Sequence, residues 1–303
     1  MKILYFIAAL SALLFPFGAD AQLLYKVEGE NLPAPSYIFG THHLAPVSFL
    51  DSVSGLKEAL LNTDAVAGEI DMTGSSVAMA MQMQPYMTAP EDSILSKVYS
   101  PQRFEQLNLM FEKGDIMPGV NLYALERLKP MAVINLVSIS IFRKTMPDYD
   151  PSAQIDAILQ KYAVESGKRV IALETPARQA ELLFNFQPIS VQAESLALLL
   201  ENPEEAAENA RELNKAYLDH DIATLKDLSF KDPNGDDPFM EALVDRRNTD
   251  WTERLDSIFR QQPVLVACGA LHLPGEKGLL NLLKQKGYTI TAVDVPQKRE
   301  NIF

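Results

Sequence analysis

The chain has 303 residues and a formal net charge of −13 at pH 7, from 27 basic and 40 acidic side chains. This acidity excludes nucleic acid and anionic membrane surfaces as partners, because both require a basic face on the protein. Hydrophobic residues make up 47% of the chain, which is enough for the core of one large domain.

Residues 1–21 have the pattern of a secretory signal peptide. Lys2 precedes an apolar run over residues 3–15, and residues 19–21 read Ala-Asp-Ala, an A-x-A cleavage site. We therefore expect a mature chain that begins at Gln22, is periplasmic or secreted, and has no stable membrane insertion. No cysteine stands at the cleavage site, so we expect no lipid anchor there.

The first elements of the mature chain predict a βαβ unit. Residues 23–27 indicate an edge strand, and residues 37–39 indicate a second strand that ends at a glycine. Helical spacing of apolar residues follows over 53–61, and a short apolar strand follows over 64–70. A βαβ crossover is right-handed almost without exception, so the second and third strands should run parallel.

Two helical insertions are predicted, over about 72–150 and 180–260. Their helices are expected at 75–87, 103–113, 122–142, 203–220 and 239–259. A helix over 155–163 and a strand over 169–173 lie between the insertions, and a solvated loop is expected at 232–238. The C-terminal part repeats the βαβ plan, with a strand at 263–267, a helix at 278–286 and a strand at 288–293.

These elements predict one α/β domain over residues 22–303. Its sheet should be small and mostly parallel, formed from two pseudo-repeated βαβ halves, with the helical insertions forming a cap.

The phrase Gly-x-x-His-Leu occurs twice, at residues 40–44 and 269–273. Each copy follows an apolar run, so His43 and His272 should lie just past the carboxyl ends of two strands, where open α/β sheets form their sites. Imidazole is the commonest metal ligand and a general base near neutral pH. If the two strands are neighbours, both histidines enter one pocket. Otherwise they are solvated turn histidines or traces of an old duplication.

Two acidic residues stand at the same edge of the predicted sheet. Glu69 and Glu174 each follow a strand, where they could complete a metal site, act as a general base, or remain solvated. Asp71 is a reserve ligand, two residues beyond Glu69. Arg247 and Asn248 lie on a predicted helix, where they could orient a substrate and stabilise an oxyanion, or lie exposed without a role.

Other polar and sulfur-containing residues are expected to be structural. The methionines of residues 79–87 could bind Cu(I), although a flexible apolar helix is favoured. His42 is either a second-sphere residue or exposed, and His220 is expected to interact with a helix C-terminus. Cys268 is expected to be a small buried residue rather than a metal ligand or nucleophile.

The chain resembles the TraB/PrgY/GumN family, which is related to the Tiki metalloproteases. The resemblance covers nearly the whole mature chain, through segments at residues 24–27, 37–43, 68–69, 128–131, 167–168, 173–175, 247–251, 269–275 and 287–288. It implies an α/β core with helical inserts and a metal-dependent hydrolytic site. The residues at the matching positions are His43, Glu69, Glu174, Arg247, Asn248 and His272.

The resemblance leads to specific expected roles for these residues. His43, Glu69 and His272 would bind a divalent ion, which could be Mn, Co or Zn because the ligands are nitrogen and oxygen atoms. Glu174 would act as a base or as a second-sphere residue of the metal site. Arg247 and Asn248 would orient the substrate or stabilise an oxyanion. The expected reaction is hydrolysis of a peptide or a small molecule.

Two alternatives remain open. A more distant resemblance to a heme-binding lipoprotein implies a protein that binds heme or a peptide signal without turnover, and a non-catalytic surface protein could retain a relic site.

Overall fold

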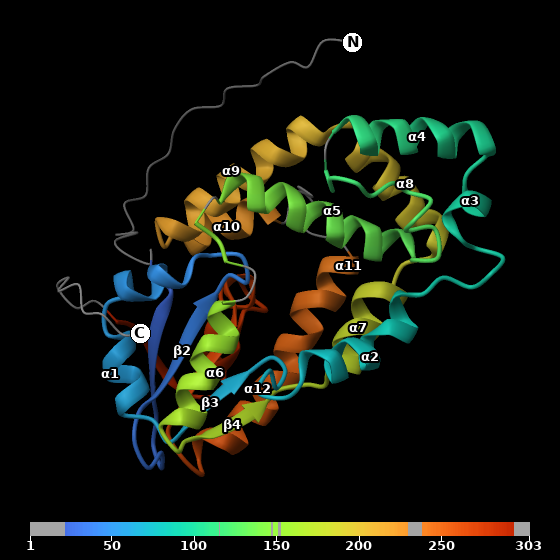
Figure 1. The fold of residues 1–303 in the computed structure, drawn as a ribbon. Helices are drawn as coiled ribbons and strands as arrows, with labels where there is room; N and C mark the ends of the chain where they lie inside the picture. Colours follow the sequence, from blue (N-terminus) through green and yellow to red (C-terminus); the bar gives the residue numbers. More distant parts are fainter. Residues whose placement is uncertain (1–21, 115, 147, 151–152, 230–237, 294–303) are drawn as a thin grey trace, which may run out of the picture.

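The structure is a computed structural model that describes residues 22–114, 116–146, 148–150, 153–229 and 238–293. The predicted signal peptide and most of the predicted loop at 232–238 lie outside these residues. One six-stranded sheet forms the centre of the fold (Figure 1). Its strands are β1 (Leu24–Glu28), β2 (Ser36–Thr41), β3 (Ala65–Gly68), β4 (Arg169–Ala172), β5 (Val264–Gly269) and β6 (Thr289–Ala292).

The strand order β4-β3-β5-β2-β1-β6 brings the two His-containing motifs together. β5 lies between β3 and β2 and pairs with both in parallel, so Gly40 lies opposite Cys268 and Thr41 opposite Gly269. β4 is also parallel to β3, whereas β1 pairs antiparallel with β2 and with β6. The predicted mostly parallel α/β sheet is therefore confirmed.

The prediction that residues 23–27 form an edge strand was wrong. β6 pairs with the outer side of β1, from Tyr25 opposite Ala292 to Glu28 opposite Thr289. Strand β1 is accordingly buried, with Leu24 and Val27 at most 1% exposed. Local sequence does not show which strand occupies the edge, because a strand from the other end of the chain supplies the last pairing.

Helices cover the sheet and extend beyond its strand ends. Those that pack into the main core with the sheet include α1 (Leu56–Leu61), α6 (Ile155–Glu165), α12 (Arg246–Phe259) and α13 (Leu279–Gln285). Figure 1 shows α6 crossing in front of the sheet, with α12 beside it. The main core includes the fully buried Phe39, Leu265 and Phe259.

A second group of helices forms the predicted cap, which Figure 1 shows above the sheet and to its right. Its helices are α2 (Ser76–Met87), α3 (Leu95–Val98), α4 (Pro101–Lys113), α5 (Pro130–Thr145), α7 (Pro176–Asn185), α8 (Ile189–Glu201), α9 (Pro203–Leu218) and α10 (Ile222–Ser229). Helices α3, α4, α5, α8 and α9 of this cap share a core of their own, which includes Phe104, Phe111 and Val137. Among the described residues, no helix is long and apolar enough to cross a membrane.

Two predicted helices have different starting points in the structure. The helix expected at 122–142 is α5, which begins only at Pro130, because the residue before a proline is pushed out of the helical region and Lys129 is extended. The helix expected at 53–61 is shorter, since Gly55 has a φ of 78° and α1 follows it.

The last long helical stretch begins with α11 (Pro238–Met240). A π-helical turn over Glu241–Asp245 then connects α11 to α12. Such turns occur often at functional sites.

Candidate active site

A cavity of about 530 Å³ opens where the parallel strands end. The side chains that reach it from the strand ends include His43 after β2, Glu69 after β3 and His272 after β5. Arg247, from α12, also lines it. The neighbouring positions of β2 and β5 therefore bring both motif histidines to one cavity.

The glycines of the two motifs allow close approach. A Cβ atom on Gly40 would lie 2.7 Å from Cδ1 of Leu273 and 3.1 Å from Cα of Ala270, so the first motif packs directly on the second. In the second motif, the backbone N–H of Gly269 donates to Oε1 of Glu69 at 2.8 Å. A Cβ on Gly269 would lie 3.2 Å from the same oxygen. Small residues are thus required for contacts that position the site.

His43 is held by a buried carboxylate. Its Nδ1 lies 2.8 Å from Oδ2 of Asp156, whose Oδ1 accepts a hydrogen bond of 2.7 Å from Oγ1 of Thr41. The Asp156 side chain is 6% exposed and that of His43 is 55% exposed. The negative charge of Asp156 raises the pKa of His43 to about 9, although solvent around the imidazole weakens this interaction. Asp156 thereby orients the imidazole with Nδ1 toward α6.

The tautomer of His272 follows from its contact with Asn248. The amide nitrogen of Asn248 donates to the backbone oxygens of His272 (3.2 Å) and Lys277 (2.9 Å), so its Oδ1 must be the acceptor that faces His272. Nδ1 of His272, 2.6 Å from that oxygen, is therefore the donor, and Nε2 is the acceptor that faces Nη1 of Arg247. Burial lowers the pKa of His272 to about 3, which keeps the ring neutral.

Arg247 lies between the acidic residues and His272. Its Nη2 donates to Glu69 and Glu174, at 2.5 Å in both cases, and its Nε donates to Glu174 at 3.2 Å. Its Nη1 donates to the backbone oxygen of Leu243 (2.8 Å) and lies 3.1 Å from Nε2 of His272. The guanidinium also stacks on Trp251, with 4.5 Å between Cζ and the ring centroid.

The two glutamates have pKa values shifted in opposite directions. Burial by itself would raise the pKa of Glu69, but His272, the charge of Arg247 and His43 outweigh this effect and lower it to about 2. Burial raises the pKa of Glu174, and its hydrogen bond to Arg247 offsets only part of that effect. Divergent environments for a carboxylate pair are typical of acid–base sites.

The predicted site residues form one cluster, but they contact the cavity differently. His43, Glu69, Arg247 and His272 line it, whereas Glu174 and Asn248 are not among its lining residues. Glu174 lies outside the cavity lining and accepts two hydrogen bonds from Arg247. Both polar atoms of the Asn248 amide are used to hold His272, so this geometry does not support the expected role of Asn248 as an oxyanion donor.

The sequence analysis did not identify Asp156 and Gln179 as site residues. Nε2 of Gln179 donates to both Glu69 (2.9 Å) and Glu174 (3.3 Å) and so connects the two carboxylates. A signal existed for Asp156, since Asp156 and Gln160 are polar residues at i and i+4 on the buried face of α6. For Gln179, on an amphipathic surface helix, no comparable signal exists.

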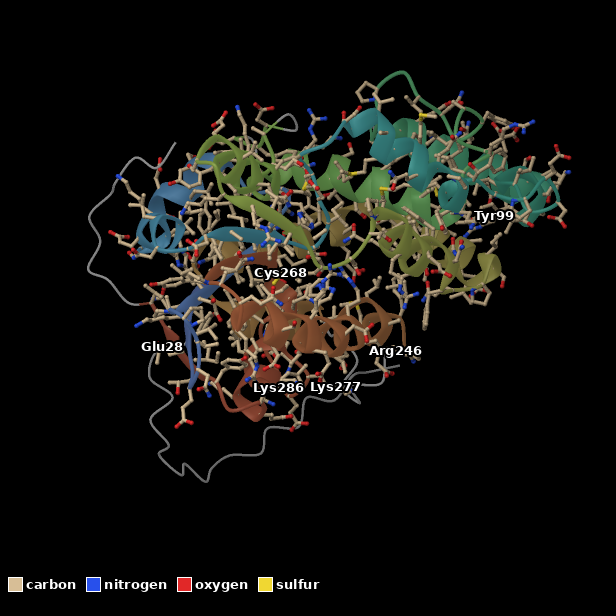
Figure 2. The ribbon with its side chains drawn as sticks, turned by 90° about the horizontal axis from the view of Figure 1, so that it is seen from below. Glu28, Tyr99, Arg246, Cys268, Lys277 and Lys286 are labelled. Atoms are coloured by element: carbon tan, nitrogen blue, oxygen red, sulfur yellow. The ribbon has the colours of Figure 1, made fainter. Side chains whose placement is uncertain are left out.

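His42 and His220 pack against aromatic rings, and Cys268 is buried in the sheet. The His42 ring packs edge-on against Phe142 and Tyr217, at 5.8 and 5.2 Å between centroids, and burial lowers its pKa to about 4. His220 packs instead on Phe49, outside the cavity lining. Cys268 is buried in β5, within the sheet region (Figure 2), and burial raises its thiol pKa well above the usual value.

Two other segments singled out in the sequence lie apart from the cavity lining. Oδ1 of Asp71 accepts hydrogen bonds from the backbone N–H and the hydroxyl of Thr73, which forms a local turn. The methionine-rich helix α2 has no buried residue and packs against α7.

The donor atoms suit a divalent metal ion, but Arg247 contacts two of the three residues that would bind it, Glu69 and His272. Both motif histidines have Nδ1 bound to an oxygen acceptor, the arrangement that leaves Nε2 for a metal, and Glu69 supplies a carboxylate. Within the described part of the chain, no group of three or more His, Cys, Asp or Glu side chains is arranged to hold an ion. Arg247 contacts both Glu69 and His272, and its positive charge balances the charge of Glu69 in this arrangement.

Residues 23–292 match the TraB/PrgY/gumN family, and the chain belongs to that family. The match covers the sheet, the cap and every residue of the cluster. No curated protein and no solved structure matches the chain significantly.

Proposed function

We propose that this protein is a metal-dependent hydrolase that cleaves peptides at the cavity. The observation that carries this proposal is the shared orientation of the two motif histidines. His43 and His272 each have Nδ1 fixed by an oxygen atom, of Asp156 and Asn248, while both rings line one cavity with Glu69. Turn histidines without a role do not require such buried partners.

His43, His272 and Glu69 would hold the divalent ion, and Mn, Co and Zn all accept these ligands. The ion would polarise the scissile carbonyl and lower the pKa of a water molecule. Because its pKa is low, the Glu69 carboxylate is charged at neutral pH, where it is paired with Arg247 and would bind the ion in exchange for that contact. The His43 Nδ1 proton is shared with Asp156, which leaves Nε2 directed away from that carboxylate.

Arg247 would act on the substrate. Glu174 and Gln179 fix the guanidinium group and the adjacent Glu69, so Arg247 holds its positive charge at the cavity without loss of side-chain entropy on binding. A preorganised positive charge of this kind stabilises the negative charge that develops on a carbonyl oxygen. Glu174 is accordingly a positioning residue, which acts through Arg247.

The test is cleavage of a broad peptide library by purified protein loaded separately with Mn, Co and Zn, with and without a chelator. We expect chelator-sensitive cleavage that His43→Ala and His272→Ala both abolish. His43→Ala should keep its stability because the imidazole is 55% exposed. His272→Ala removes a buried ring and leaves Oδ1 of Asn248 without its donor, so circular dichroism must show that this variant is folded. His220→Ala is the matched control, since His220 lies outside the cavity lining and its loss should leave cleavage unchanged.

The two carboxylates separate metal binding from turnover. Glu69→Gln should weaken metal retention in a dialysis assay, whereas Glu174→Gln should retain metal and lower kcat. If no loaded form cleaves any peptide and the protein instead binds heme stoichiometrically through the same histidines, the hydrolase proposal is wrong and a binding protein replaces it.

A further inference from the structure

The cavity has two chemically different halves. Its polar half consists of the strand-end groups described above, together with Arg247. Its other half is formed by helices of the cap and by the π-helical turn before α12. The main side chains of this apolar half are Phe142, Leu183, Leu213, Leu225, Leu243 and Val244.

Charged groups of a ligand would have no partner in the apolar half. Among the described residues that line it, none carries a charge. In the polar half, Glu69 is paired with Arg247, and His43 is paired with Asp156. A charged group placed against the apolar half would lose its water without gaining a counter-ion, which is strongly unfavourable. An uncharged apolar group, in contrast, gains from leaving water there.

The dimensions fit a bulky group. A volume of about 530 Å³ lies within the range of cavities that enclose whole small ligands. Several side chains of the apolar half, including Leu183, Leu213 and Leu243, are only partly buried by the protein itself. Their remaining surface is available to a ligand that reaches the polar half at the same time.

We propose that the apolar half binds a large, uncharged side chain of the substrate, such as Leu, Met or Phe, next to the bond that is hydrolysed. This inference rests on the proposed function and specifies its substrate class: peptides with an apolar residue beside the scissile bond. The close proximity of the two halves places the scissile carbonyl near Arg247 when the apolar side chain is bound.

The experiment compares fluorogenic peptides that differ at a single position beside the cleaved bond, with Gly, Leu, Phe, Asp or Lys there. We expect kcat/KM for Leu and Phe to exceed that for Gly by at least about tenfold, since one methylene in an apolar pocket is worth 10- to 200-fold. Asp and Lys should fall below Gly. Mass spectrometry identifies the cleaved bond, and the series is repeated on its other side.

A variant tests where the selectivity arises. Leu183→Arg adds a positive charge to the apolar half and should lower kcat/KM for Leu by at least tenfold while raising it for Asp. The control is Leu198→Arg, on α8. Leu198 is 61% exposed and lies outside the cavity lining, so this variant should leave the preference for Leu over Asp unchanged. Leu183→Ala should weaken the Leu preference, and it serves if the arginine variant does not fold.

Binding to the metal-free protein separates failure of this inference from failure of the proposed function. Blocked Leu and Gly dipeptide amides are titrated calorimetrically, and we expect Leu to bind more tightly in the wild type than in Leu183→Arg. Leu-selective binding without any cleavage would overturn the hydrolase and keep the apolar specificity. Cleavage with equal rates for Gly and Leu would overturn this inference and keep the hydrolase.

Discussion

The pair formed by His43 and Asp156 allows a direct test of the electrostatics of the site. Asp156→Asn keeps the size of the side chain and an oxygen that can accept the Thr41 hydroxyl, but removes the negative charge. The variant therefore isolates the charge that raises the pKa of His43 from the packing around it.

The expected change follows from the pKa of His43 in the folded protein. With a pKa of about 9, His43 is about 97% protonated at pH 7.5, and screening by solvent lowers this fraction. In Asp156→Asn the pKa should return toward the ordinary value of about 6.5, which leaves only about 10% protonated at pH 7.5.

Stability should follow the same change with a definite sign. Because the folded-state pKa of His43 is raised, the stabilisation is fully present below pH 6.5 and is lost as pH rises through the folded-state pKa. Asp156→Asn should therefore destabilise the protein more at pH 6 than at pH 10. For an imidazole that is 55% exposed, we expect a difference of about 1 kcal/mol between these two pH values.

The assay is an NMR titration of the metal-free protein with ¹⁵N-labelled histidine. The chain has only four histidines, and His43→Ala assigns the signal. Asp219→Asn, which removes an equal charge beside His220, is the control and should leave the His43 titration unchanged. Denaturant unfolding at pH 6 and pH 10 measures the stability difference. Titration of His43 near pH 6.5 in both the wild type and Asp156→Asn would refute the reasoning.

Two further predictions concern close packing and the buried charges. Gly40→Ala should lower the free energy of unfolding by about 1–3 kcal/mol, because its Cβ would lie 2.7 Å from Leu273. Gly74→Ala is the matched control, since a Cβ there would have no atom within 4 Å. Equal losses of stability for the two variants in a urea titration would contradict the packing argument. Arg247→Met should cost about 3–5 kcal/mol at pH 7, because two buried carboxylates lose their cation, and less near pH 3 as they become protonated. The control is Arg246→Met, at the exposed neighbouring residue that Figure 2 labels, which should change stability little. A loss of stability in Arg247→Met that does not depend on pH would count against the charge explanation.

Much of the local structure can be read from the sequence, because its determinants are short-range. The apolar runs that end in Gly40 and Gly269 are strands followed by turns, as the pattern predicts. A threonine followed by proline is typical of a helix N-terminus, and Thr175 caps α7, with Oγ1 accepting from the backbone N–H of Arg178 at 3.2 Å. Pro130, at which α5 begins, is also visible in the sequence, because proline disfavours helical backbone at the residue before it.

The placement of elements was decided only by the tertiary structure. Insertion of β5 between β2 and β3 makes the two histidine motifs neighbours, and no local signal specifies that pairing across more than 200 residues. The pairing of β6 with β1 likewise joins strands from opposite ends of the chain, and no local signal specifies it. Strand order depends on how the apolar faces of helices and sheet are buried together, which is a property of the whole chain.

Within the site, the sequence determined which chemical groups are available at the strand ends: His43, Glu69 and His272. The tertiary structure decided what each group contacts. The partner of His43 comes from α6, and the cation between the carboxylates, Arg247, comes from α12. These partners are buried polar groups whose desolvation must be offset by hydrogen bonds, and only the folded arrangement shows which group satisfies which.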